Sequence, residues 1–455
     1  MAGRGKVDMR YLERNWALPF SFSIVFAPLS ALSSPASAVP SFAVQTGQPC
    51  AMCHVGGFGP QLTQFGRDFK IGGYTNRAVN FNVPLSAQVI ASYVHTKADQ
   101  NPPAAPNVKP NDNFALDQVG LFLAGGVGNH LGGFVQVTYQ GIAKAWTWDN
   151  LDLRAVTTSE VAGAPVVFGA SFNNSPGIDD PWNTLPVWGF VYTGSVLRPS
   201  PATAPLFSGA LAQTTLGLTG YAWIDGKVYI EAGGYRSPAA SLLSSFGVDP
   251  TAPGEINGIA PYARIAYQKA VGAGDAQIGA FLLSASLYPG RDRSTGFTDR
   301  YTDLGVDASY QLPRENGDVF SVNARYTHES QALRASFALG NATNVNDSLD
   351  DIRIDASYYY RNKIGATVGV FDTTGSFDPL LFTGRTGRPD SQGVTIQLDG
   401  TPFGSGSPLG SRFNVRVGVQ YTAYTRFDGA RTNYDGAGAN ASDNNTVRVF
   451  TWFAF

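Results

Sequence analysis

Cysteine, methionine, histidine and charge are all scarce in this sequence of 455 residues. It contains two Cys, three Met and four His, and charged residues make up 15% of it. A zinc site built on cysteine needs a second pair of ligands, and the chain has no other Cys to supply one. The formal net charge of −2 gives no basic surface for nucleic acid, so we expect no nucleic-acid partner.

Long hydrophobic runs are also missing from most of the chain. After residue 38 no stretch reaches about 18 consecutive apolar residues, so we expect no membrane-spanning helix there. The largely apolar run 16–32 follows four basic residues and precedes the small-residue pattern Ala36-Ser37-Ala38. This order predicts a signal peptide over residues 1–38, with an uncleaved anchor as the alternative. We therefore expect an exported protein, either soluble in the periplasm or a β-barrel.

The two cysteines stand close together and are followed by a histidine, in the sequence Cys50-Ala51-Met52-Cys53-His54. C-x-x-C-H is the attachment pattern of a c-type haem, in which two thiols add to the porphyrin vinyl groups and the histidine binds iron. A redox dithiol is the alternative, but it does not need the histidine and is expected in a βαβ context that is absent here. The pattern predicts one covalent haem c, held by Cys50, Cys53 and His54.

The segment around this motif is short. Leu62, Phe65 and Phe69 recur at helical spacing, and their side chains would cover one face of the haem. Arg67 and Lys70 could pair with the haem propionates, or they could lie on a solvated helix face. Because a soluble cytochrome that encloses its haem is longer than this segment, we expect the rest of the chain to help cover the cofactor.

From about residue 83 the chain alternates apolar and polar residues in segments of about ten residues. In Phe413–Thr422 the odd positions are apolar and the even positions are polar or small. A soluble β-sandwich also alternates, but here Arg325, Arg353 and Arg416 stand at the centres of polar faces. That pattern favours a transmembrane barrel with a wet lumen and an apolar face toward lipid. The predicted strands cover residues 83–95, 114–127, 131–143, 145–158, 165–173, 211–225, 227–237, 259–270, 275–288, 301–312, 318–333, 349–361, 363–374, 391–401, 413–427 and 446–455.

The lengths of the connections support the same interpretation. Connections after even-numbered strands are short and those after odd-numbered strands are long, except near Lys144 and at 402–412. Short turns are periplasmic and long loops extracellular in outer-membrane barrels, so both termini would be periplasmic. The last strand ends at Phe455 and is similar to the C-terminal strand of bacterial outer-membrane proteins.

These features together predict a mainly β protein of the bacterial outer membrane. Its fold would be a transmembrane antiparallel β-barrel of about 16 strands over residues 81–455. A small N-terminal α-helical segment over residues 39–80 would carry the c-type haem in or at the lumen, after the signal peptide 1–38.

An exported haem motif followed at once by such a barrel resembles the fused monohaem cytochrome c–porin family, the outer-membrane iron oxidases of Fe(II)-oxidising bacteria. The specific resemblance covers Val39–Gly47, Cys50–His54 and Leu62–Tyr74, whereas the barrel is similar mainly in architecture and length. The link Val55–Gly59 is richer in glycine than the family pattern.

The resemblance implies an electron-transfer function. An Fe(II)-oxidising cytochrome of this kind takes electrons from extracellular Fe(II) through one haem to a periplasmic c-type cytochrome or another carrier. The barrel would bring the haem within reach of the outer surface without admitting the metal. Two alternatives stay open: an electron conduit for a different donor or acceptor, and a transport porin with an accessory haem.

The second axial ligand of the haem iron is left open by the sequence. Beyond the expected signal peptide the only methionine is Met52, inside the motif, so Met/His ligation is excluded. His95 and His328 share strand parity with apolar residues expected to face lipid. His130 falls in a predicted periplasmic turn and is the remaining histidine candidate. A five-coordinate iron, or another oxygen or nitrogen ligand, is also compatible with the sequence.

Overall fold

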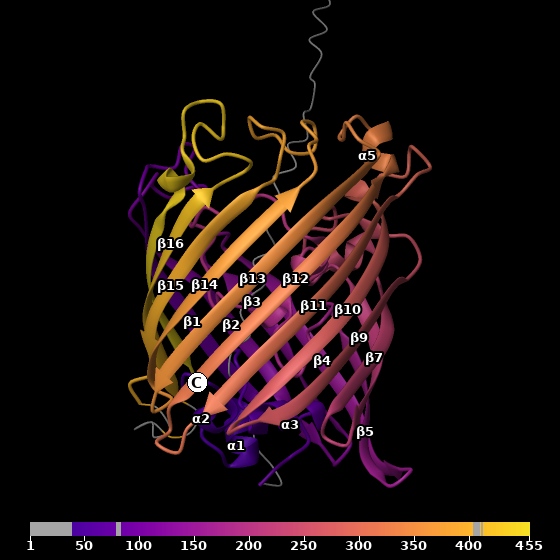
Figure 1. The fold of residues 1–455 in the computed structure, drawn as a ribbon, viewed down its shortest axis with the longest axis vertical. Helices are drawn as coiled ribbons and strands as arrows, with labels where there is room; N and C mark the ends of the chain where they lie inside the picture. The colour runs from indigo at the N-terminus through magenta and orange to yellow at the C-terminus, as the bar shows by residue number, and fades with distance from the viewer. Residues whose placement is uncertain (1–38, 79–82, 404–409, 411–412) are drawn as a thin grey trace, which may run out of the picture.

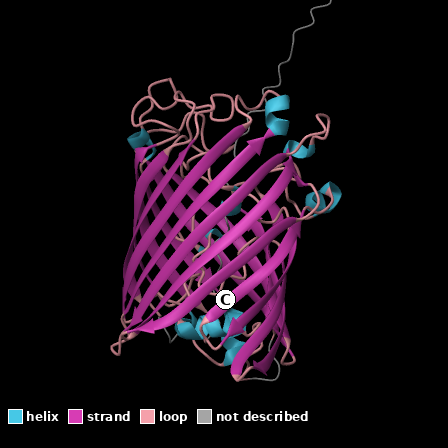
Figure 2. Cartoon of the chain, turned by 45° about the vertical axis from the view of Figure 1, so that its right-hand side comes forward, coloured by secondary structure: helices cyan, strands magenta, loops and turns pink. Residues whose placement is uncertain are grey.

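The computed structural model describes residues 39–78, 83–403, 410 and 413–455. Sixteen long strands in these residues form one closed antiparallel β-barrel, in which each strand pairs with the next and the last pairs with the first (Figures 1 and 2). The predicted signal peptide, 1–38, lies outside the described residues, as do residues 79 and 80 of the predicted haem segment.

The elements have the following bounds. The strands of the wall are β1 (Leu85–Thr96), β2 (Asn113–Val127), β3 (Leu131–Gln140), β4 (Ala145–Val161), β5 (Ala164–Asn173), β6 (Leu216–Ile224), β7 (Val228–Arg236), β9 (Ala260–Val271), β10 (Gly274–Tyr288), β11 (Asp299–Pro313), β12 (Val319–Leu333), β13 (Asn346–Tyr360), β14 (Ile364–Gly375), β15 (Ser391–Gly400), β16 (Asn414–Arg426) and β17 (Thr446–Ala454). A two-residue strand, β8 (Glu255–Ile256), pairs with the end of β10. The helices are α1 (Pro40–Thr46), α2 (Cys50–Cys53), α3 (Gln64–Ile71), α4 (Ala240–Ser245) and α5 (Arg334–Ala338), with 3₁₀ turns η1 (Pro186–Trp188), η2 (Leu206–Ser208), η3 (Pro289–Arg291) and η4 (Ala441–Asn444).

Every predicted strand is confirmed, with ends that differ by a few residues at most positions. The predicted alternation of connections is confirmed too: short turns gather at one end of the barrel and long loops at the other (Figure 1). The turn between β6 and β7 shows why such turns can be short. Asp225 and Gly226 both have positive φ, 52° and 64°, as the tightest hairpin turns require.

The outer face of the barrel is apolar. Side chains alternate between the two faces of each strand, and large hydrophobic residues on the outward face are exposed. Examples from around the wall are Leu218, Ile278, Leu304, Ile354, Leu398 and Val449. Such a surface suits lipid rather than water. In the described part of the chain, no helix is both long enough and apolar enough to cross a membrane.

The inner face carries charges, as predicted, and several of them are buried. Of the three arginines named from the sequence, Arg416 is buried, whereas the Arg353 side chain is 34% exposed. Arg154, Arg264, Arg416 and Arg448 are each at most 2% exposed. Each forms an ion pair with a carboxylate, at 2.8 Å to Asp152, 2.7 Å to Asp307, 2.5 Å to Asp399 and 2.8 Å to Asp117, respectively. Pairing is what makes burial of these charges tolerable. The expectation of a wet lumen is therefore wrong for these regions.

The connection between β5 and β6, residues 174–215, fills much of the lumen; we call it the inner loop. It was expected among the extracellular loops, but its residues are mostly buried. Its backbone is held by the wall: Arg448 donates to the carbonyl of Thr193 at 3.1 Å, and the Tyr424 hydroxyl donates to that of Pro199 at 2.7 Å. Its apolar side chains would be exposed to water in an external loop, so burial in the lumen is favoured.

The N-terminal segment lies inside the barrel at the end where the short turns gather. Helices α1, α2 and α3 are at that end in Figure 1, whereas α5 is at the opposite end. Gln45 ties α1 to the wall, since its Oε1 accepts from the Gly126 backbone N–H at 2.8 Å. The lumen is thus filled by two segments: helices α1–α3 at one end and the inner loop further along.

Candidate functional site

The two cysteines lie on one turn of helix. Helix α2 begins after Pro49, and its four residues place Cys50 and Cys53 three positions apart, on the same side. The chain then turns into extended backbone at His54, whose N–H donates to the carbonyl of Cys50 at 3.0 Å. Both cysteines are free thiols. One short turn thus presents both thiols and directs the next residue away from the helix.

Helix α3 is packed closely against this motif. His54 and Leu62 form an antiparallel bridge, and the Thr63 N–H donates to the carbonyl of Cys53 at 2.9 Å. The Thr63 hydroxyl also caps the helix by accepting from the Gly66 N–H. A Cβ on Gly66 would lie 2.3 Å from the Cys53 carbonyl oxygen, so only glycine allows this approach.

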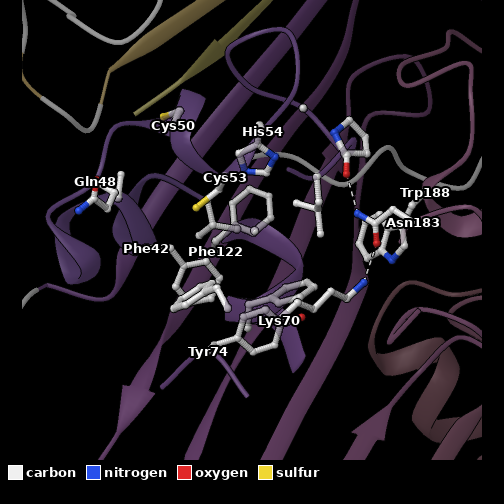
Figure 3. A pocket seen from close by; sticks show the side chains of 18 of the residues that line it. Phe42, Gln48, Cys50, Cys53, His54, Lys70, Tyr74, Phe122, Asn183 and Trp188 are labelled. Carbon is white, nitrogen blue, oxygen red and sulfur yellow. Dashed lines mark hydrogen bonds between the residues drawn. The ribbon is translucent and has the colours of Figure 1, made fainter. Parts of the chain in front are cut away.

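The motif and α3 line a pocket that opens to solvent (Figure 3). Its empty volume is about 780 Å³, which includes the solvent space at its open side. Cys50, Cys53 and His54 all face it, as predicted for a haem site. The other lining residues come from the N-terminal segment, the barrel wall and the inner loop: Val39, Phe42, Ala43, Gln48, Pro49, Gly59, Pro60, Leu62, Gly66, Phe69, Lys70, Tyr74, Phe122, Phe134, Gln136, Asn183 and Trp188.

Most of this lining is apolar or aromatic. Of the three residues expected to cover a haem face, Leu62 and Phe69 line the pocket, but Phe65 does not. Phe42 and Tyr74 stack with ring centroids 5.2 Å apart and an interplanar angle of 4°. These two aromatic residues are not among the predicted site residues, although both lie within the segments Val39–Gly47 and Leu62–Tyr74 that carry the resemblance.

The two basic residues of α3 have different surroundings. Arg67 points to the barrel wall, with its Nη2 3.6 Å from Asp275, and it does not line the pocket. Lys70 does line the pocket, and its Nζ donates to the Asp180 carbonyl and to Asn183 Oδ1, both at 2.7 Å. Each basic residue is only 4% exposed, so the solvated-face alternative is wrong for both.

Burial sets the protonation states of the motif. It lowers the pKa of His54 to about 4, so the imidazole is neutral near pH 7, which is the form that binds a metal. It raises the pKa of the Cys53 thiol to about 12, and the neighbouring Cys50 adds to this effect. Reactive dithiols and metal-binding thiols have lowered pKa values instead. The donor set therefore fits a haem, to which the thiols are joined as thioethers, better than a redox dithiol.

The remaining histidines do not reach the pocket. His130 is exposed in the turn between β2 and β3, and its Nδ1 lies 2.9 Å from the Val156 carbonyl oxygen. The structure does not bring His130, the low-confidence candidate for a second ligand, to the pocket that Cys50, Cys53 and His54 line. His95 and His328 each contact an aspartate carboxylate, on the outward face of their strands as expected.

A smaller cavity of about 260 Å³ lies beside the pocket and shares Asn183 with it. Buried polar atoms line it, including the Tyr192 hydroxyl and Gln61 Oε1, which have no hydrogen-bond partner. Within the described ranges, no group of three or more His, Cys, Asp or Glu could hold a metal ion. The inner loop thus forms part of both cavities, a role that no local sequence signal indicates.

Comparison with known proteins gives the following result. No protein-family model and no curated protein matches the sequence. Among solved structures the chain is similar to an anion-selective porin from Comamonas acidovorans, with 12% identity, 82% of this chain and 98% of that chain covered, and a TM-score of 0.43. It is also similar to the outer membrane channel DcaP of Acinetobacter baumannii, with 13% identity, 82% of this chain and 96% of that chain covered, and a TM-score of 0.44. A third similar structure is OprB of Pseudomonas putida, with 12% identity, 82% of this chain and 94% of that chain covered, and a TM-score of 0.47. Likeness at these values carries no argument about family or function, and the barrel is established by its own strand pairing.

Proposed function

We propose that this protein is an outer-membrane cytochrome that carries one covalent haem c and transfers electrons from Fe(II) outside the cell to periplasmic carriers. The observation that supports this most directly is the convergence of the only two thiols and the adjacent His54 on one apolar pocket. A bound haem supplies one-electron redox chemistry, and Fe(II) gives up one electron.

The residues around the pocket suit this role. Cys50 and Cys53 would hold the porphyrin through two thioethers, and the neutral imidazole of His54 would bind the iron. The rings of Phe69, Phe122 and Phe134, with their apolar neighbours, would keep water from the cofactor. Solvent access and local polarity are the means by which a protein adjusts a redox potential.

Two features support the outer membrane as the location: the apolar outer face and the alternation of short turns and long loops. If the short turns are periplasmic, as in outer-membrane barrels, the pocket opens near the periplasm, where a soluble carrier could collect an electron. We therefore propose that both termini are periplasmic.

This arrangement also bears on the electron donor. The fifteen residues of β13, at about 3.3 Å per residue and a tilt of about 40°, span about 38 Å of barrel height. The pocket is at the end away from the long loops, so a haem held there would be far from the outer surface if those loops are extracellular. An electron from an extracellular donor would have to cross the part of the lumen that the inner loop fills.

A transport porin with an accessory haem is the second candidate. A barrel of sixteen strands is large enough to hold a channel, which favours this alternative. The burial of the inner loop and the paired lumenal charges oppose it, because they leave little room for solute.

The decisive experiment mixes oxidised, purified protein with Fe(II) in a stopped-flow spectrometer and follows haem absorbance. We expect rapid reduction in the native protein and at least tenfold slower reduction in His54→Ala, which keeps both thioether links. His95→Ala, on the outer wall, is the matched control and should behave as the native protein does.

Two other outcomes would each favour a different function. A haem that stays oxidised with excess Fe(II) but accepts electrons from other donors would replace the iron-oxidase function with a general electron conduit. Protein without covalent haem that conducts ions in a bilayer would favour the transport porin.

A further inference from the structure

Lys70 is the one amine or imidazole besides His54 among the described residues that line the pocket. Helix α3 directs it there for the same reason that it directs Gly66, four residues earlier, against Cys53: residues four apart share a helix face. Figure 3 shows Lys70 on the side of the pocket opposite Cys53 and His54. Its side chain is therefore across the cavity from the imidazole expected to bind the iron.

The hydrogen bonds of Lys70 match those of a neutral amine. Its Nζ has two acceptors, the Asp180 carbonyl and Asn183 Oδ1, both at 2.7 Å and both on the inner loop. A neutral amine has two N–H donors and one lone pair, so these two acceptors use both donors and leave the lone pair free. An ammonium has three donors, and the described residues give Nζ only these two hydrogen-bond acceptors; the Trp188 ring, another part of the pocket lining, has its centroid 5.1 Å from Nζ.

Burial also favours the neutral form. It lowers the pKa of Lys70 to about 7, with a further contribution from the positive charge of Arg154. A large fraction of the amine would therefore have a lone pair available near neutral pH.

Other donors of the pocket are less suitable. Tyr74 would need to be a phenolate, but its hydroxyl donates to Asp152 Oδ2 at 2.7 Å, and burial raises its pKa well above the ordinary value. Both polar groups of the Asn183 side chain already have a partner: its Oδ1 accepts from Lys70, and its Nδ2 donates to the Pro60 carbonyl. Gln136 donates to Thr138 and Asp149 in the wall.

We propose that the Lys70 amine is the second axial ligand of the haem iron, opposite His54. The proposal rests on the proposed function only in requiring a covalent haem in this pocket; it does not depend on the electron donor. It also gives the inner loop a role, because Asp180 and Asn183 hold the amine and so connect the loop to the iron site.

The test is the spin and coordination state of the ferric haem, read by electron paramagnetic resonance and resonance Raman spectroscopy at slightly alkaline pH. The native protein should be six-coordinate and low-spin, and Lys70→Ala should convert most of the haem to a high-spin form. Methylamine added to Lys70→Ala should restore the low-spin signal, because a small amine can occupy the space of the lost side chain.

Lys70→Arg separates ligation from charge. Arginine keeps the positive charge but has no lone pair to offer a metal, so this variant should lose the low-spin signal as Lys70→Ala does. If Lys70 instead paired with a haem propionate, Lys70→Arg would keep the native spectrum. Asp68→Ala, at an exposed position on the same helix, is the control and should keep the low-spin signal.

Several results would overturn the proposal. A high-spin native protein would do so without any variant, and so would a low-spin Lys70→Ala with unchanged spectra. These outcomes differ from failure of the proposed function, which would appear as absence of covalent haem or as haem that Fe(II) cannot reduce.

Discussion

At the scale of single residues, the pocket depends on close packing between α3 and the C-x-x-C-H motif. Gly66 is the tightest point, because its Cα rests against the Cys53 carbonyl and a Cβ would overlap that oxygen. The oxygen belongs to the backbone of the motif, so it cannot move aside without shifting the cysteine. Small changes here should therefore alter the position of the thiol.

Gly66→Ala should reduce haem attachment and destabilise the N-terminal segment, by about 1–3 kcal/mol, the usual cost of forcing extra atoms into a packed site. Covalent haem per protein, measured by absorbance, and protection of this segment in hydrogen exchange are the readouts. Gly220→Ala is the control, because its Cβ would meet only one atom, at 3.9 Å. Full haem loading and unchanged protection in Gly66→Ala would contradict the packing argument.

Removing both thiols should abolish covalent haem. In Cys50→Ala, Cys53→Ala no thioether can form, so haem staining should disappear from a denaturing gel, whereas the native protein should keep it. Each single variant should lose most of its stain. A double variant with full covalent haem would be incompatible with the assignment of the motif.

At the scale of elements, the inner loop determines whether the barrel can conduct. Asp180 is one of its main anchors: its Oδ1 lies 3.0 Å from Arg264, and its Oδ2 accepts from the Thr184 N–H at 2.8 Å. Arg264 keeps Asp307 as a second partner, so loss of Asp180 leaves this arginine paired. The loop should therefore loosen without collapse of the wall.

We expect the native protein to show little conductance in planar bilayers, and Asp180→Ala to raise it severalfold, because fewer bonds hold the loop in the lumen. Asp292→Ala, at an exposed position between β10 and β11, is the matched control and should leave the conductance low. A native protein with the conductance of an open sixteen-stranded channel would show that the loop does not block the lumen.

At the scale of the whole molecule, stability comes from the closed ring of strand pairs. Within the described residues, closure pairs both edges of each of the sixteen wall strands, and β1 and β17 are joined over nine residue pairs from Gln88↔Ala454 to Thr96↔Thr446. Such barrels resist unfolding by detergent until heated. Because its outer face is apolar, we expect the protein in the outer membrane.

The unboiled protein should migrate differently from the boiled protein in a detergent gel, and circular dichroism should be dominated by β structure. Fractionation should place it in the outer membrane. Recovery only from the soluble periplasm would contradict the interpretation of the outer face as lipid-facing.

The sequence by itself determined the features that depend on local pattern. The strands could be predicted because side chains alternate between the two faces of a strand, so a period of two appears directly in the residue order. The positions of Cys50, Cys53 and His54 at one site follow from their adjacency in the chain. The lengths of turns and loops could be predicted as well, because they are the numbers of residues between successive predicted strands.

Only the tertiary structure decided which polar side chains meet in the lumen. Arg67 and Lys70 lie on one helix, three residues apart, yet one binds the wall and the other faces the pocket, because the docking of α3 sets which side each one meets. The inner loop looked external because its length fitted the alternation, and His130 looked close to the haem because its turn was expected at the mouth. The position of the inner loop has a physical cause that no local pattern encodes: contacts across the lumen join residues more than a hundred positions apart. His130 lies outside the pocket because its turn places the ring against Val156 in the wall.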